Sequence, residues 1–210
     1  LSFGEAAVVA TICFGMFILA SLQAVLSGFP EARFTDASHV WGIFIELMLG
    51  ATALIYLRLR RFDIAWLYPR RDHRGTRTGI ALYAVGWIAG ALAVLPLQAA
   101  DQSLPMVQFS SVGMSVGPIV LFAMVYGTFE EVFLLGVLTR GLADRGPVFA
   151  AGVSLLVRVS YHLYQGPAGA VWILVFGIVA TAYYLRTGRL WPVVFAHILG
   201  DVVPFALDGA

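Results

Sequence analysis

The chain has 210 residues, of which 60% are hydrophobic and 12% charged, and its mean hydropathy is +0.87. A soluble domain usually has about 45–50% apolar and about 25% charged residues, so this composition excludes an ordinary soluble protein and indicates an integral membrane protein. The net charge of +1 gives no electrostatic reason to expect a nucleic-acid partner.

Seven apolar stretches are long enough to cross the hydrocarbon core of a bilayer, which takes about 20 residues of helix. We expect an all-α transmembrane bundle of about seven spans, or eight if an interfacial or missing N-terminal helix is added. Residues 1–210 then form a single membrane domain, because no soluble module is long enough to fold alone. The predicted spans are residues 5–28, 38–59, 79–99, 113–139, 147–164, 168–186 and 190–207.

The basic residues between the spans predict the orientation of the bundle. All thirteen are arginines, which suggests a GC-rich bacterial genome, and eleven of them lie around residues 58–78, 140–145 and 186–189. Seven spans place these three connections on one side of the membrane. By the positive-inside rule that side is cytoplasmic, so the N-terminus is cytoplasmic and the C-terminus external. We therefore expect a protein of the bacterial cytoplasmic membrane whose arginines also contact anionic lipids of the bilayer.

Ionisable residues within the spans are the main functional indication. A charged side chain at membrane depth costs about 2.5 kcal/mol or more, unless it faces a polar cavity or a partner. We interpret Glu46 as a hydrogen-bonding residue in helix packing. The full set is Glu46, Glu130, Glu131, Arg158, His162, His197 and Asp201.

The spacing of these residues predicts which of them share a helix face. Arg158 and His162 are four residues apart, and so are His197 and Asp201, so each pair lies on one face of its helix. A structural His–Asp pair is as good an explanation of the second spacing as a functional one.

The adjacent acids Glu130 and Glu131 differ by about 100° around a helix, so one can face a cavity while the other faces a neighbouring helix. Together with the two histidines they suit a hydrolytic centre, because a carboxylate shielded from water becomes a usable base near neutral pH. The histidines and acids could hold a divalent metal that activates water. Alternatively, the histidines could donate to an oxyanion while glutamate takes a proton from water.

Three segments in the second half of the chain resemble the motifs of one family. These are EEVFLLG (130–136), SYHLYQGP (160–167) and RTGRLWPVVFAHILGD (186–201). In order and spacing they are similar to the motifs of the CPBP family, the CAAX proteases and bacteriocin-processing enzymes, also called Abi proteins. The resemblance covers residues 113–207, the expected CPBP-like core, and leaves residues 1–112 as variable N-terminal spans.

The resemblance implies an intramembrane peptidase, often described as metal-dependent. It implies that Glu130 activates water and that Glu131 supports the site. It also implies that His162, His197 and Asp201 bind a metal or stabilise the tetrahedral intermediate. Zinc or another divalent ion is the expected cofactor. The expected metal ligands are Glu130, His162, His197 and Asp201.

The chain departs from the family pattern at two positions. Leu135 stands where the first motif has an arginine, and Arg158 stands where the second has an aromatic residue. We hypothesise that Arg158 reaches Glu131 or Glu130 across the helix interface and supplies the missing charge, because an unpaired arginine there is costly. The third motif ends in Asp201, and an ionised aspartate cannot donate a hydrogen bond, which favours a metal site.

Three functions remain open from the residues and the resemblance. The first is an endopeptidase acting on a membrane-associated peptide or protein. The second is a catalytically inactive relative that acts as a membrane scaffold or binding partner, because loss of the motif arginine at Leu135 also fits an inactive protein. The third is a small proton-coupled carrier, for which paired broken helices or inverted repeats are expected but not found. Irregular backbone is expected at Gly117–Pro118 and at residues 166–169.

Overall fold

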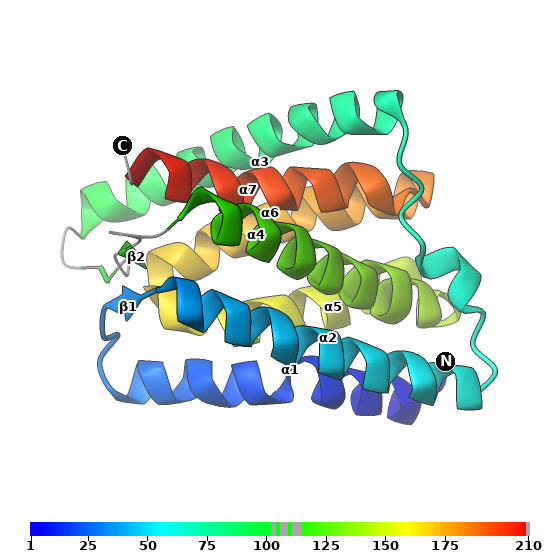
Figure 1. The fold of residues 1–210 in the computed structure, drawn as a ribbon. Helices are drawn as coiled ribbons and strands as arrows, with labels where there is room; N and C mark the ends of the chain where they lie inside the picture. Colours follow the sequence, from blue (N-terminus) through cyan, green and yellow to red (C-terminus); the bar gives the residue numbers. More distant parts are fainter. Residues whose placement is uncertain (102–103, 106–108, 111–114, 209–210) are drawn as a thin grey trace.

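The computed structural model describes the chain except residues 102–103, 106–108, 111–114 and 209–210. The described residues form an all-α bundle, as predicted (Figure 1). The helices are α1 (Phe3–Leu26), α2 (Asp36–Leu59), α3 (His73–Ala100), α4 (Val116–Glu131), α5 (Pro147–His162), α6 (Gly166–Thr187) and α7 (Leu190–Asp208).

Several short elements join these helices. A π-helix, η2 (Val132–Thr139), continues α4, and 3₁₀ turns lie at η1 (Ile64–Leu67), η3 (Ala143–Arg145) and η4 (Leu163–Gln165). Two-residue strands, β1 (Ala32–Arg33) and β2 (Phe109–Ser110), pair in parallel. They bring the α1–α2 connection beside the segment before α4 at one end of the bundle (Figure 1).

Several helical stretches in the described chain are long and apolar enough to cross a membrane. Five meet the criterion, and Leu190–Pro204 is apolar but shorter. The last of the five runs through both α5 and α6, so the exact number of crossings stays a prediction. The five stretches are Phe3–Leu26, Asp36–Leu59, His73–Ala100, Val116–Thr139 and Pro147–Thr187.

Local sequence explains where the helices begin and end. Ser2 caps α1 and Thr35 caps α2, each through a side-chain oxygen that accepts a backbone N–H of the first turn. Asp72 caps α3, and its carboxylate also binds Arg189 just before α7. The backbone N–H of Gly75 and the Arg189 guanidinium hold the pKa of Asp72 below its ordinary value. This contact ties the arginine-rich end of α3 to that of α7.

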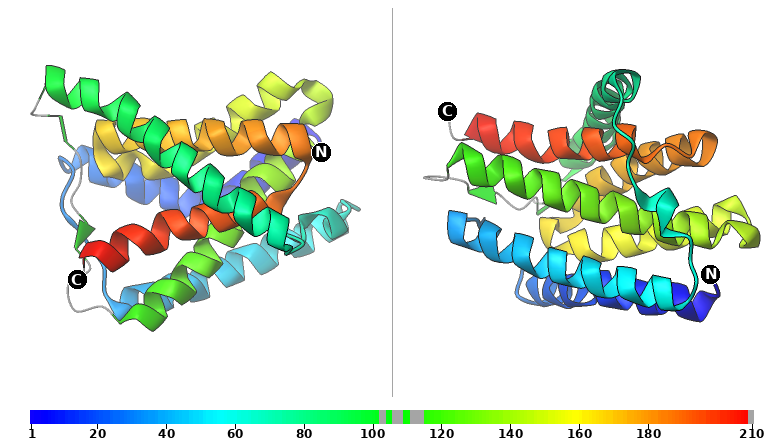
Figure 2. Two further views of the ribbon diagram at one scale, coloured as in Figure 1. Left: turned by 90° about the horizontal axis from the view of Figure 1, so that it is seen from above. Right: turned by 45° about the vertical axis from the view of Figure 1, so that its right-hand side comes forward.

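The helix α4 and its continuation η2 form the centre of the bundle. Helix α2 packs on one side of α4 and α7 on the other, while α1 packs on α5. Helix α3 crosses the outer face of α6 and α7, as the view from above shows (Figure 2). Large apolar side chains such as Leu19, Trp41 and Leu92 point outward from the bundle, as expected for a surface covered by lipid.

The π-helical turn directly after Glu131 was not predicted. All eight residues of η2 are buried. The carbonyl oxygen of Leu134 accepts hydrogen bonds from the hydroxyls of Thr139 and Ser154, each at 3.0 Å, so the wide turn leaves this polar group satisfied. Irregular backbone at membrane depth is tolerated where protein covers it.

The two expected sites of irregular backbone have different outcomes. Gly117 and Pro118 lie in the first turn of α4 without interrupting it, because a proline there needs no backbone N–H. That expectation was therefore wrong. Gly166, with φ +81°, does separate η4 from α6, but residues 167–169 lie inside α6, so the expectation for residues 166–169 is confirmed only at Gly166.

Close packing of α3 on α7 depends on Gly79. A Cβ atom at this position would lie 2.7 Å from the backbone oxygen of Pro192 and 3.0 Å from the Phe195 side chain. We expect Gly79→Ala to lower the free energy of unfolding by about 1–3 kcal/mol, as overpacking usually does. Unfolding in detergent measures this. Gly152→Ala is the matched control, because a Cβ there meets nothing within 4 Å. Equal stabilities of the two variants would contradict the prediction.

Candidate active site

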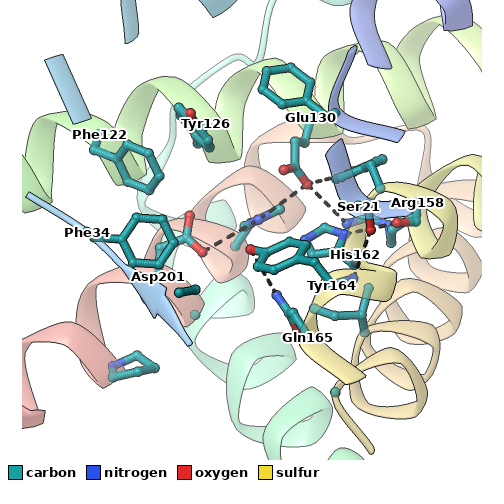
Figure 3. Close-up of a pocket in the computed structure, with 18 of the residues that line it drawn as sticks. Ser21, Phe34, Phe122, Tyr126, Glu130, Arg158, His162, Tyr164, Gln165 and Asp201 are labelled. Atoms are coloured by element: carbon teal, nitrogen blue, oxygen red, sulfur yellow. Dashed lines mark hydrogen bonds and ion pairs between the residues drawn. The ribbon is translucent and has the colours of Figure 1, made fainter. Parts of the chain in front are cut away.

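A cavity of about 740 Å³ lies inside the bundle and collects most of the predicted site residues. It is lined by side chains of α1 to α7, and it extends to residues 30–34 in the α1–α2 connection. That end lies opposite the arginine-rich connections of the bundle (Figure 1). Figure 3 shows part of the cavity wall. The predicted residues that line it are Glu130, Arg158, His162, His197 and Asp201.

Glu131 lies behind the cavity wall and is 0% exposed. Its Oε2 accepts a hydrogen bond from Nη2 of Arg158 at 2.7 Å, and its Oε1 is 2.6 Å from Nδ1 of His197. Because a carboxylate oxygen can only accept here, Nδ1 of His197 is the protonated nitrogen. Glu131 therefore joins α4, α5 and α7 through two short, charge-assisted contacts.

Arg158 makes the contact that we hypothesised from the sequence. Its guanidinium is 1% exposed, binds Glu131 and lies 4.0 Å from Oε2 of Glu130. Leu135, the residue in place of the motif arginine, is buried in the hydrophobic core. A guanidinium thus reaches the paired glutamates from α5. Whether one at position 135 could replace it stays a prediction.

Glu130 is the member of the acidic pair that faces the cavity (Figure 3). The Tyr161 hydroxyl donates a hydrogen bond to its Oε2 at 2.5 Å, and Nε2 of His197 is 3.7 Å from the same oxygen. Tyr161 also stacks on Phe14 of α1, with ring centroids 5.0 Å apart. Tyr161 was not predicted as a site residue, although it lies next to His162 in the second motif.

His162 is held by its own helix. Its Nδ1 lies 2.9 Å from the backbone carbonyl oxygen of Arg158, which can only accept, so Nδ1 is the donor. In the neutral ring the lone pair is then on Nε2. Arg158 and His162 are four residues apart, as noted from the sequence, and the hydrogen bond between them joins the His162 ring to the Arg158 backbone.

His197 and Asp201 form the predicted pair on α7. Nε2 of His197 is 3.8 Å from Oδ1 of Asp201, while its ring meets Phe176 edge-on at 5.7 Å. The imidazole is thus fixed on its Nδ1 side by Glu131 and turns Nε2 toward Glu130 and Asp201. This orientation makes Nε2 the atom that can act on a molecule in the cavity.

The histidines and acids of the cavity are residue types that bind metals, but their side chains are not arranged as a metal site. Both histidines carry the Nδ1–H contact that orients metal-binding imidazoles, and zinc accepts imidazole and carboxylate ligands. Among the residues that the structure describes, however, no three His, Cys, Asp or Glu residues are grouped to hold an ion.

Glu46 does not fit its interpretation as a hydrogen-bonding residue in helix packing. It lies on α2, is 2% exposed and lines the same cavity. Its Oε2 has no hydrogen-bond partner within the described part of the chain. This single acid lies outside the three motifs, and the packing of α2 on α4 brings it to the cavity.

Comparison with protein-family models covers the second half of the chain. Residues 112–203 match the model described as "Type II CAAX prenyl endopeptidase Rce1-like". The matched residues include the three motifs around Glu130, His162 and His197. The searches of curated proteins and of solved structures find no match.

Proposed function

The chain belongs to the CPBP family, and from this premise we propose that it is an intramembrane endopeptidase with Glu130 as its general base. The family match suggests CAAX-type endopeptidase activity, and the apolar helices indicate an integral membrane protein. The substrate in this proposal is a membrane-associated peptide or protein. The location is the bacterial cytoplasmic membrane, with the arginine-rich connections in the cytoplasm.

The division of labour between the two adjacent glutamates is the observation that carries the proposal. Glu131 is fully buried and engaged by Arg158 and His197, so it holds the helices and the imidazole in place. Glu130 faces the cavity, where its carboxylate can meet a water molecule and a substrate. One acid is therefore structural and the other is free to exchange a proton.

The proposed reaction uses protein groups at stated atoms. The Glu130 carboxylate takes a proton from water, and the water oxygen attacks the peptide carbonyl carbon. Nε2 of His162, with its lone pair, accepts the second water hydrogen and orients the water. Nε2 of His197, when protonated, donates to the oxyanion of the tetrahedral intermediate. The C–N bond then breaks, and Glu130 returns the proton to the leaving amine.

Zinc or another divalent ion remains the alternative electrophile. It would polarise the carbonyl or the water in the place of the His197 donor. The residues that would hold it are Glu130, His162, His197 and Asp201. Elemental analysis of the purified protein, repeated on a His162→Ala/His197→Ala variant, tests this. A stoichiometric metal that is lost in the variant would support the metal form.

Tyr161 acts through Glu130 as a positioning residue. Removing its hydroxyl removes a hydrogen bond to a charged group, which contributes about 1.5–3 kcal/mol in other proteins. We expect Tyr161→Phe to lower kcat by roughly tenfold or more with little change in KM, because Phe14 stacking keeps the ring in place. Steady-state kinetics measures this. Tyr183→Phe, on α6 and outside the cavity wall, is the control and should keep wild-type kcat; a wild-type kcat in Tyr161→Phe would contradict the role.

The peptidase proposal is tested by a search for products. Purified protein in proteoliposomes is incubated with bacterial membrane protein fragments, and newly formed termini are identified by mass spectrometry. New termini that are absent from protein-free liposomes support the proposal. If none form, the scaffold alternative is favoured. Within the described structure, the Arg158–Glu131 contact argues against that alternative, because it restores a guanidinium to the acidic pair.

A further inference from the structure

Glu46 is a third buried acid in the cavity, and it comes from α2, outside the three motifs. It lines the same cavity as Glu130 of α4 and Asp201 of α7. A buried carboxyl group normally has partners, because burying an unpaired charge is costly. In the described part of the chain, Oε2 of Glu46 has none. The carboxyl group lines the cavity without the partner that a buried acid normally has.

Acidic side chains outnumber the unpaired arginines in the cavity wall. The guanidinium of Arg158 is committed to Glu131, and that of Arg33, near the β1 end, binds Glu31. Arg33 and Arg158 are the two arginines in the described cavity wall. Glu46, Glu130 and Asp201 thus share an environment in which imidazoles are the remaining basic groups. An anionic ligand would be repelled there, and a cationic one attracted.

Aromatic rings form much of the wall beside these acids. Tyr83, Trp87, Tyr126 and Trp172 all line the cavity, and the rings of Trp87 and Trp172 meet edge to face at 5.2 Å. Figure 3 shows Tyr126 and Phe122 on the α4 side. The face of an aromatic ring attracts a cation, most strongly when water is excluded. Acid and aromatic groups together suit an organic cation.

We propose that this cavity binds a cationic group of the substrate, an ammonium or guanidinium, which pairs with the carboxylate of Glu46. The inference rests on the proposed function in taking the ligand to be a peptide substrate. It assigns the substrate class as peptides with a basic group close to the bond that is cleaved. Because α2 packs on α4, the Glu46 carboxylate holds this group near Glu130 and not at the β1 end.

Binding of a small probe tests the proposal without any turnover. Protein in nanodiscs of zwitterionic lipid is titrated with 4-phenylbutylammonium and with the neutral 4-phenylbutanol, and tryptophan fluorescence reports binding through Trp87 and Trp172. We expect wild type to bind the ammonium at least about tenfold more tightly than the alcohol, the size of one charged hydrogen bond. In E46Q this preference should vanish while affinity for the alcohol stays the same.

Further variants keep the result interpretable. E31Q removes an acid that is already paired with Arg33, so it should keep the full preference. E46D keeps the charge and should retain most of the preference. E46A, which also removes the carboxylate, replaces E46Q if that variant does not fold. Equal binding of the two probes by wild type, or an unchanged preference in E46Q, overturns the proposal. If the preference for the ammonium depends on Glu46 but the protein cleaves no peptide, the cation subsite is supported and the peptidase function is refuted.

Discussion

Replacing Arg158 with leucine is expected to lower the free energy of unfolding by about 3–5 kcal/mol, the usual cost of removing one partner of a buried ion pair. Glu131 has no exposed surface, so water cannot solvate the carboxylate that the leucine leaves behind. The loss also releases α5 from α4, which Arg158 and Glu131 connect. Unfolding by denaturant in detergent micelles measures the change. Arg33→Leu, at an exposed ion pair, is the control and should change little.

The double variant Arg158→Leu/Leu135→Arg tests the exchange of positions between the two motifs. If the guanidinium can serve from either helix, the double variant recovers stability or activity relative to Arg158→Leu alone. Failure to recover either would reject the exchange. The π-helical turn makes this a demanding test, because it alters how position 135 is aligned with Glu131.

The two adjacent glutamates should respond differently to the same substitution. Glu131→Gln leaves Arg158 buried without its carboxylate and is expected to cost about 3–5 kcal/mol in the free energy of unfolding. Glu130→Gln should unfold close to wild type, because the amide oxygen still accepts the Tyr161 hydroxyl and the Arg158 contact is long, at 4.0 Å. Unfolding curves of the two variants under one condition measure the difference. Equal stability losses would contradict separate roles.

Helical spacing and membrane energetics predicted much of this site. The four-residue interval between His197 and Asp201 fixed their common face, and the 100° between Glu130 and Glu131 separated a cavity-facing acid from a buried one. The cost of an unpaired arginine at membrane depth predicted that Arg158 needs an acid, and Glu131 is that acid. The spacing predictions succeed because each depends on the geometry of a single helix. The Arg158 prediction succeeds because an unpaired charge at membrane depth has a large free-energy cost.

The parts that were not predicted depend on packing between helices. Tyr161 contributes because Phe14 of α1 and Glu130 of α4 lie on either side of it. Glu46 is one acid in an apolar span with no motif around it, and only the α2–α4 contact brings it to the cavity. Within the π-helix, Thr139 gives one hydroxyl to the Leu134 carbonyl, but the second hydroxyl comes from Ser154 of α5, a contact that only helix packing makes.

The role of Glu130 as the base is tested most directly by the cleavage rate of one peptide by folded Glu130→Gln protein, compared with wild type in the same proteoliposomes. General-base catalysis by a positioned side chain contributes about 10²- to 10⁴-fold, so we expect the cleavage rate to fall by that factor while the unfolding curve stays unchanged. Cleavage by Glu130→Gln at the wild-type rate would contradict the assignment of Glu130 as the base.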